Sequence, residues 1–212
     1  MPPGIAQSTP VAALLVALAA CGAPAEPAAT LRYPVDDPVE LQGFGAWNPN
    51  WLGYHLAVDV HAAAGTPIYA IADGVVRAVF LHDEAVGYGG LVLIEHQLGS
   101  EPVTGLYGHV SSRNPPPIQV GDRVSAGATI AFAADDDEDG GAWAPHLHFG
   151  LRPGRVDLGA QYCGRWLYGG YTRPCAGVTH DDVLAQWRDP LALLGGLGTT
   201  PGETPRESVR AR

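Results

Sequence analysis

The stretch Pro145-His146-Leu147-His148-Phe149-Gly150-Leu151-Arg152 sets the structural pattern of this chain, because two kinds of side chain alternate along it. In a β-strand, successive side chains point to opposite faces of the sheet. Leu147 and Phe149 therefore share one face, which should point into the core, whereas His146 and His148 share the other. Residues two apart lie about 6.6 Å apart along a strand. The stretch predicts a strand that presents two neighbouring imidazoles on one face.

Short apolar segments separated by turn residues run through the middle of the chain. The 28 Gly and 19 Pro, against 16% charged residues, suit short strands and many turns better than long helices. Asp73-Gly74 is a strong hairpin-type turn between two such segments. We therefore predict a mainly β fold with a mainly antiparallel sheet. The expected strands cover residues 66–72, 74–80, 91–96, 105–110, 129–134 and 146–152, and a further turn covers 120–124.

One peripheral helix is expected near the C-terminal end of the folded region. Thr179 can cap its first turn, with Asp182 three residues later as the second member of a capping box. Pro190 should stop it, because proline cannot continue a helix. Its apolar stripe consists of Val183, Leu184 and Trp187.

Length and charge limit the classes of protein to consider. The chain has 212 residues, 46% of them hydrophobic, which allows one domain with appendages. We expect the folded domain to cover residues 31–194. The formal net charge is −10, and all twelve cationic residues are Arg that form no basic run. Nucleic-acid binding is therefore disfavoured, because it needs clustered positive charge.

The N-terminus has the features of an export leader. An apolar run over residues 11–20 is too short to span a bilayer as a helix and ends in Leu18-Ala19-Ala20-Cys21. Small residues after such a run are typical of a secretory cleavage site. A plain secretory signal cut nearby, or a buried helix, is the alternative. The arrangement Leu-Ala-Ala-Cys resembles the lipobox of bacterial lipoproteins, which implies a signal peptide over 1–21 and lipidation of Cys21.

Two flanking segments have little to bury. Residues 22–30 are rich in Ala and Pro and should tether the anchor to the domain. Residues 195–212 are rich in Gly, Thr, Pro and Arg, and we expect them to be disordered.

If Cys21 is lipidated, Cys163 and Cys175 remain as an even pair. In an exported chain such a pair predicts a disulfide. The alternative is a cysteine-based metal site, but no third Cys is left to complete one. In the chain-entropy model, a disulfide closing a loop of this size stabilises the fold by roughly 3 kcal/mol.

Three metal ligands and one spare imidazole can be drawn from His55, Asp59, His146 and His148. A hydrolytic zinc site needs three protein ligands, an open position for water and a titratable side chain nearby. Two His and one carboxylate match catalytic zinc better than the cysteine-rich structural sets, although they also fit some non-haem iron sites. This set of side chains predicts one metal ion and a hydrolase.

The spacing of His55 and Asp59 requires a bend in the chain. In a straight strand the two residues would lie about 13 Å apart. A helix would bring them together, but the nearby Val and Gly residues disfavour one here. We therefore expect His55 to come from a loop and Asp59 from the start of a strand.

Further stretches surround these residues in a fixed order. They are Tyr54-His55-Leu56-Ala57-Val58-Asp59-Val60, Gly65-Thr66-Pro67-Ile68-Tyr69-Ala70, Asp73-Gly74-Val75-Val76, Leu106-Tyr107-Gly108-His109-Val110-Ser111, Val120-Gly121-Asp122-Arg123-Val124 with Gly127, and Pro145-His146-Leu147-His148-Phe149. Over roughly residues 54–151, the chain resembles the lysostaphin/LytM-type family of zinc metallopeptidases.

The resemblance implies both a fold and a site. The fold would be an antiparallel sheet of the duplicated hybrid motif type. One Zn²⁺ ion would be held by His55, Asp59 and His148, and His109 and His146 would be the unliganded catalytic pair. The implied function is a zinc-dependent endopeptidase that hydrolyses peptide stems or cross-links of bacterial peptidoglycan.

The expected location follows from the leader. A lipid anchor at Cys21 would hold the protein on a membrane beside peptidoglycan, at the periplasmic face of the outer membrane if the host is Gram-negative. Two rival functions stay open: a metal-containing but non-catalytic module that binds cell wall or activates amidases, and a lipoprotein whose metal only stabilises its fold.

Other polar residues have several interpretations. The acidic run Asp135-Asp136-Asp137-Glu138-Asp139 is either a solvated loop, a rim that favours cationic substrate groups, or a calcium site. His96 is expected to be a structural strand residue near the cleft. We expect His61, His82 and His180 to be surface or hydrogen-bonded residues.

Overall fold

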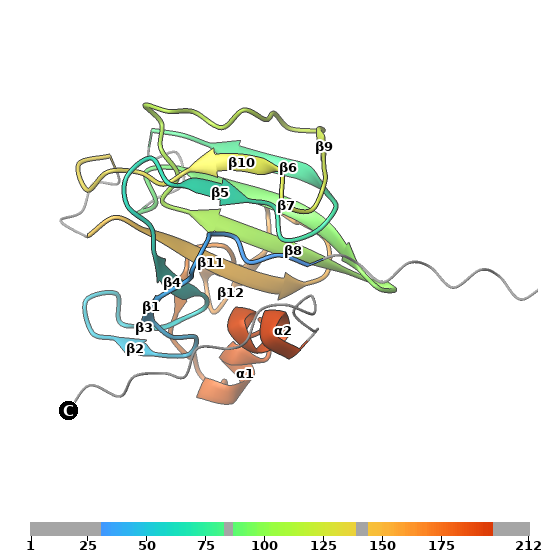
Figure 1. Cartoon of the computed structure of the whole chain (residues 1–212). Coiled ribbons are helices and arrows are strands. Elements are labelled where there is room, and N and C mark those ends of the chain that lie inside the picture. Colours follow the sequence, from blue (N-terminus) through green and yellow to red (C-terminus); the bar gives the residue numbers. More distant parts are fainter. Residues whose placement is uncertain (1–30, 83–86, 139–143, 197–212) are drawn as a thin grey trace, which may run out of the picture.

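The computed structural model describes residues 31–82, 87–138 and 144–196 (Figure 1). The proposed leader with Cys21 and the linker (1–30) lie outside these residues, as do Asp139 and the tail from residue 197. In the described part of the chain, neither helix has the length and apolarity needed to cross a membrane.

Seven antiparallel strands form the central sheet, which confirms the predicted mainly β fold (Figure 1). The strand that carries the two imidazoles, β11, lies inside this sheet between β4 and β8. In spatial order the strands are β1 (Glu40–Gln42), β4 (Val58–His61), β11 (His146–Pro153), β8 (Glu101–Gly108), β7 (Leu91–Leu98), β6 (Gly74–Phe80) and β9 (Arg123–Val124).

Smaller elements surround the central sheet. In the described ranges they are the pair β5 (Pro67–Tyr69) and β10 (Thr129–Phe132), the three-stranded sheet of β2 (Trp47–Asn48), β3 (Gly53–His55) and β14 (Tyr171–Thr172), the pair β12 (Gln161–Tyr162) and β13 (Arg165–Trp166), and the helices α1 (His180–Leu184) and α2 (Pro190–Gly196). The second helix ends at Gly196, the last residue that the structure describes.

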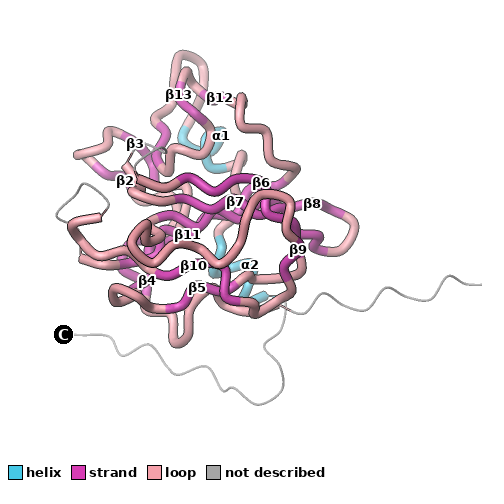
Figure 2. The backbone as a smooth tube through the Cα atoms, turned by 90° about the horizontal axis from the view of Figure 1, so that it is seen from above, coloured by secondary structure: helices cyan, strands magenta, loops and turns pink. Residues whose placement is uncertain are grey.

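The central sheet is buried on both faces. Along β7, Leu91 and Leu93 join one apolar cluster, whereas Val92 and Ile94 join the other. The first cluster includes residues of α1 and of the segment around β12 and β13, and the second includes residues of β5 and β10. Figure 2 shows the strands of the sheet between these two layers. Burial on both faces explains why β7 reads as a continuous apolar run.

The predicted hairpin at Asp73-Gly74 is wrong. β5 pairs with β10 in a separate sheet, and β6 pairs with β7 and β9. Asp73 Oδ1 accepts a hydrogen bond from the Ala126 N–H (2.9 Å), which ties this link between the two sheets to the loop before β10. The turn residues mark a change of chain direction, but the strand partners are set by contacts that are distant in sequence.

The C-terminal helix begins as predicted but is followed by a second one. Thr179 and Asp182 form the capping box of α1, in which each side chain accepts a hydrogen bond from the other's backbone N–H. The predicted stop at Pro190 is wrong, because this residue opens α2. Asp189 Oδ1 accepts from the two N–H groups just after Pro190 (3.0 and 3.2 Å). Proline suits the first helical position, where its missing N–H has no partner to lose.

Candidate metal and catalytic site

The folding of β3, β4 and β11 brings His55, Asp59 and His148 together. Asp59 and His148 are direct cross-strand neighbours in the central sheet. His55 is the last residue of β3, so it comes from a strand and not from a loop as expected. The chain turns over Leu56 and Ala57 before β4 begins, and this turn places His55 Nε2 3.1 Å from Asp59 Oδ1.

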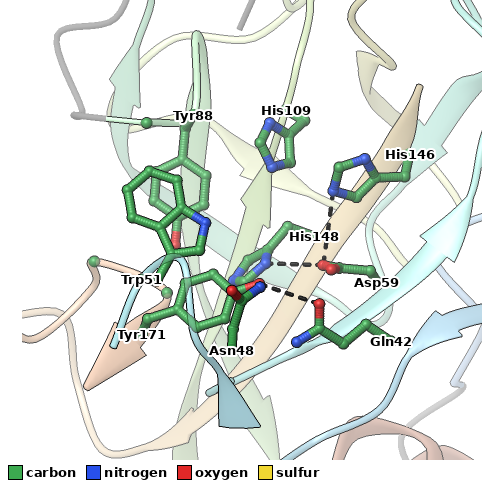
Figure 3. Close-up of a pocket in the computed structure, with 12 residues that line it drawn as sticks. Gln42, Asn48, Trp51, Asp59, Tyr88, His109, His146, His148 and Tyr171 are labelled. Carbon is green, nitrogen blue, oxygen red and sulfur yellow. Dashed lines mark hydrogen bonds and ion pairs between the residues drawn. The ribbon is translucent and has the colours of Figure 1, made fainter. Parts of the chain in front are cut away.

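One atom from each of these three side chains forms a tight triangle. His148 Nδ1 lies 2.9 Å from Asp59 Oδ1 and 3.0 Å from His55 Nε2. All three side chains are buried, and Figure 3 shows Asp59 facing the ring of His148. Two imidazole nitrogens and one carboxylate oxygen are a donor set of catalytic zinc sites. The residues present therefore fit a zinc ion.

A backbone hydrogen bond orients the first of these imidazoles. His55 Nδ1 lies 3.1 Å from the carbonyl oxygen of Gly43. A carbonyl oxygen only accepts, so Nδ1 of His55 carries the proton and donates. Its Nε2 is therefore the unprotonated nitrogen and faces Asp59 and His148. In metal sites, a hydrogen bond of this kind at one ring nitrogen orients the histidine, and the other nitrogen binds the metal.

The charge of the group also suits a divalent cation. Burial opposes ionisation of Asp59, but the adjacent imidazoles of His148 and His55 outweigh it and hold the pKa of this carboxyl well below its ordinary range. Burial lowers the pKa of His148 to about 4, so its imidazole is neutral near pH 7. A neutral imidazole and an ionised carboxylate are the forms that bind metals.

His146 and His109 lie beside this triangle (Figure 3). His146 Nε2 is 3.8 Å from Asp59 Oδ1, and its Nδ1 lies 2.8 Å from the carbonyl oxygen of Ala144, to which it must donate. The ring of His109 lies 4.3 Å from that of His146 and 6.1 Å from that of His148, measured between centroids. Two further imidazoles therefore border the group that could hold the metal.

The loop that follows His109 is held by one carboxylate. His109 has a left-handed backbone (φ 59°), which is uncommon for a residue other than glycine. Glu138 accepts hydrogen bonds from Ser111 Oγ (2.9 Å) and from the N–H groups of Ser112 (2.9 Å) and Arg113 (3.0 Å). This end of the acidic run thus has a structural role that none of the sequence interpretations included.

Aromatic and amide side chains wall the pocket above the site (Figure 3). Tyr171 stacks on the metal-site residue His55 at 4.9 Å, and Trp51 stacks on Tyr171 at 5.9 Å, measured between ring centroids. The Tyr171 hydroxyl donates to Gln42 Oε1 (3.4 Å). The sequence interpretation missed these lining residues and also Asn48 and Tyr88.

The predicted disulfide between Cys163 and Cys175 is present. It closes the segment that carries β14, in which Tyr171 pairs with His55 of β3. The disulfide loop therefore supplies one wall of the pocket. Its cysteines were visible in the sequence, but their proximity to the metal site was not.

The remaining histidines are not part of the group around Asp59. The expectation that His96 lies near the cleft is wrong, because His96 pairs with Val103, whereas the other end of β7 pairs with Gly108, next to His109. Of the other three, His61 and His82 are exposed, and His180 is half-buried with its Nδ1 3.0 Å from Asp181 Oδ1, which agrees with the expectation of surface or hydrogen-bonded residues.

Comparison with known proteins relates the chain to a family of peptidases. The family model described as peptidase family M23 matches residues 53–159. The chain is 35% identical over 98 residues to the DD-carboxypeptidase/endopeptidase Mpg of Neisseria meningitidis, covering 46% of this chain and 20% of that protein. It is 36% identical over 102 residues to the glycyl-glycine endopeptidase ALE-1 of Staphylococcus capitis, covering 46% of this chain and 24% of that protein.

The fold has a counterpart among solved structures. Lysostaphin from Staphylococcus simulans superposes with a TM-score of 0.57 at 21% identity, covering 85% of this chain and 62% of that one. This likeness concerns the fold alone. The chain spans about a fifth to a quarter of the two curated relatives above.

Proposed function

This chain belongs to peptidase family M23, and we propose that it is a zinc-dependent endopeptidase that cleaves peptide stems or cross-links of bacterial peptidoglycan. The convergence of His55, Asp59 and His148 carries the proposal, with His109 and His146 beside them. The family is zinc-dependent. One relative is named for DD-carboxypeptidase/endopeptidase activity and another for cleaving glycyl-glycine bonds, and both names support a peptide substrate.

His55, Asp59 and His148 would hold the ion. A zinc ion there supplies Lewis-acid chemistry, which makes water more acidic and polarises a peptide carbonyl. The side chains around it then have to accept a proton, stabilise negative charge and return the proton to the departing amine.

His146 is suited to act as the general base. Its Nδ1–H donates to the carbonyl oxygen of Ala144, so Nε2 is the unprotonated nitrogen of the neutral ring and can accept a proton from the attacking water. Asp59, 3.8 Å away, stabilises the imidazolium that results. The proton then passes to the amine nitrogen as the C–N bond breaks. His109, whose ring lies 4.3 Å from that of His146 between centroids, would donate a hydrogen bond to the negatively charged carbonyl oxygen.

The leader completes the proposal. We infer that the exported chain is anchored by a lipid on Cys21, which would keep the domain close to peptidoglycan and raise its local concentration there. In a Gram-negative host this places the protein at the periplasmic face of the outer membrane. Radiolabelled palmitate should be incorporated into the wild-type chain and not into Cys21→Ala.

Purified peptidoglycan tests the catalytic proposal. His146→Ala should reduce the release of new amino groups by about 100- to 10,000-fold, the usual contribution of a general base, with zinc content unchanged. His61→Ala is the matched control, because His61 is the exposed cross-strand neighbour of His146 and should retain full activity. Full activity of His146→Ala would contradict the assigned role.

The same assay separates the rival functions. A zinc-loaded chain that binds peptidoglycan and stimulates an amidase without releasing amino groups would be a non-catalytic activating module. A chain whose zinc affects only the unfolding temperature would be a structural lipoprotein. The presence of both unliganded histidines favours the enzyme.

A further inference from the structure

Two polar atoms next to the metal site are buried without a hydrogen bond to any described residue. They are the hydroxyl oxygen of Tyr88 and Nε2 of His148. Tyr88 is 4% exposed and His148 2% exposed. Leaving such a group unpaired costs about 1–3 kcal/mol. Two unpaired groups of complementary chemistry in one place therefore call for an explanation.

Both atoms border the same glycine. A methyl group on Gly170 would stand 2.5 Å from the Tyr88 hydroxyl and 3.1 Å from His148 Nε2. Gly170 is fixed in place, because its carbonyl oxygen accepts a hydrogen bond from the Leu56 N–H (2.9 Å). The bare Cα of this glycine leaves open the space between the phenol and the imidazole. In Figure 3, the hydroxyl end of Tyr88 points toward the ring of His148.

The tautomer of His148 determines which of the two groups would donate a hydrogen bond to the other. Its Nδ1 faces two acceptors, Asp59 Oδ1 and His55 Nε2, so Nδ1 is the nitrogen directed at the metal position. A neutral imidazole that uses Nδ1 as a ligand carries its proton on Nε2. That N–H then needs an acceptor, and metal-binding histidines almost always have one. The phenolic oxygen of Tyr88 has unused lone pairs on the correct side of the ring.

We propose that Tyr88 is a positioning residue for the metal ligand His148: when the metal is bound, the phenolic oxygen accepts the hydrogen bond of Nε2–H across the space beside Gly170. This inference rests on the proposed function, because it requires a metal ion at Nδ1. It adds a residue that neither touches the metal nor belongs to the two catalytic histidines. Tyr88 would fix the tautomer and the ring orientation of His148 in the metal-bound state.

The same chain contains a second tyrosine–histidine pair that serves as a control. At the other end of the central sheet, the Tyr107 hydroxyl lies 2.9 Å from His96 Nε2, and both side chains are buried. Tyr107→Phe removes the same atom from a tyrosine–histidine contact, in this case one in which the hydroxyl donates. It should affect stability without affecting the metal.

Zinc affinity tests the proposal. In competition with a chromophoric chelator, Tyr88→Phe in the full chain should bind zinc about 10- to 100-fold more weakly than wild type, the usual effect of losing such a partner. Tyr107→Phe should bind zinc as wild type does. The metal-free Tyr88→Phe protein should unfold at a denaturant concentration no lower than that of wild type, so weaker zinc binding cannot be ascribed to misfolding.

A spectroscopic readout reports the contact itself. In zinc-loaded protein with ¹⁵N-labelled histidine, the Nε2–H of His148 should give a slowly exchanging proton signal that disappears or shifts in Tyr88→Phe and persists in Tyr107→Phe. Wild-type zinc affinity of Tyr88→Phe, or an unchanged signal, overturns the role of Tyr88 and leaves the proposed enzyme intact. Failure of the wild-type chain to bind zinc overturns both.

Discussion

The two ends of the central sheet each bury a histidine beside a tyrosine, but only one of these pairs is complete. At the His96 end, Nδ1 donates to the Asp73 carbonyl (3.2 Å), Nε2 accepts from the Tyr107 hydroxyl (2.9 Å), and that hydroxyl accepts from the Ile71 N–H (3.2 Å). Every donor there has an acceptor. The His96 end is therefore a closed structural network.

At the His148 end, donors and acceptors do not balance. Nδ1 of His148 meets a carboxylate and a second imidazole nitrogen, while Nε2 has no partner among the described residues. Burial lowers the pKa of both His96 and His148 to about 4, so burial and titration do not distinguish them. An excess of acceptors around one point distinguishes a site that requires a cation from one that does not.

The largest expected difference between the two ends concerns the metal. His148→Ala should retain no zinc after dialysis and should lose more than about 1,000-fold in peptidoglycan cleavage, because the group that activates water is gone. His96→Ala should lose stability but keep one zinc per folded chain and its cleavage activity. Metal analysis and amino-group release measure both. Loss of zinc from His96→Ala would remove the distinction between the two ends.

A smaller effect should appear at acidic pH. The pKa of His96 is lowered by burial from its ordinary value of 6.5 to about 4. Between pH 6.5 and about 4, the unfolded chain binds a proton at His96 and the folded chain does not. The free energy of unfolding therefore falls as pH falls, by about 3 kcal/mol in total. The stability is fully present above pH 6.5 and is lost as the pH drops toward 4.

Denaturant titrations of the metal-free protein at pH 7 and pH 4.5 measure this effect. His96→Gln should reduce the loss between the two pH values, because one titrating group is gone, and the exposed His61→Gln should leave it unchanged. An identical pH dependence in wild type and His96→Gln would show that His96 is not held neutral by the fold.

The smallest effect sharpens the comparison of the tyrosines. In metal-free protein, Tyr107→Phe should lower the free energy of unfolding by roughly 1–3 kcal/mol, because it leaves the Ile71 N–H and His96 Nε2 buried without partners. Tyr88→Phe should not lower the free energy of unfolding, since its hydroxyl makes no hydrogen bond with the described residues. Equal losses from the two variants would mean that Tyr88 has a partner in the metal-free state.

Local patterns in the sequence predicted the strand of His146 and His148, the capping box at Thr179 and the disulfide between Cys163 and Cys175. The strand and the capping box each depend on residues within a few positions of one another. The disulfide prediction depends on the two cysteines that remain besides Cys21. The fold class followed from the density of turns and short apolar segments. The need for a bend between His55 and Asp59 followed from strand geometry alone.

What the sequence did not reveal depends on distant contacts. Asp73-Gly74 has the composition of a hairpin turn, yet the strands on its two sides join different sheets. Pro190 was expected to end a helix, but it begins a second one, in which the Leu191 N–H donates to Asp189 Oδ1. No sequence pattern marks Tyr88 or Tyr171 as a residue of the site. Both line the pocket because two segments, the turn over residues 87–90 and the disulfide loop, border it.

Anomalous diffraction at the zinc edge, from crystals of the chain grown with zinc, tests the central claim most directly. The account predicts one strong peak, bonded to His55 Nε2, Asp59 Oδ1 and His148 Nδ1, with no peak at His96. A peak elsewhere, or ligation that leaves His148 out, would contradict it.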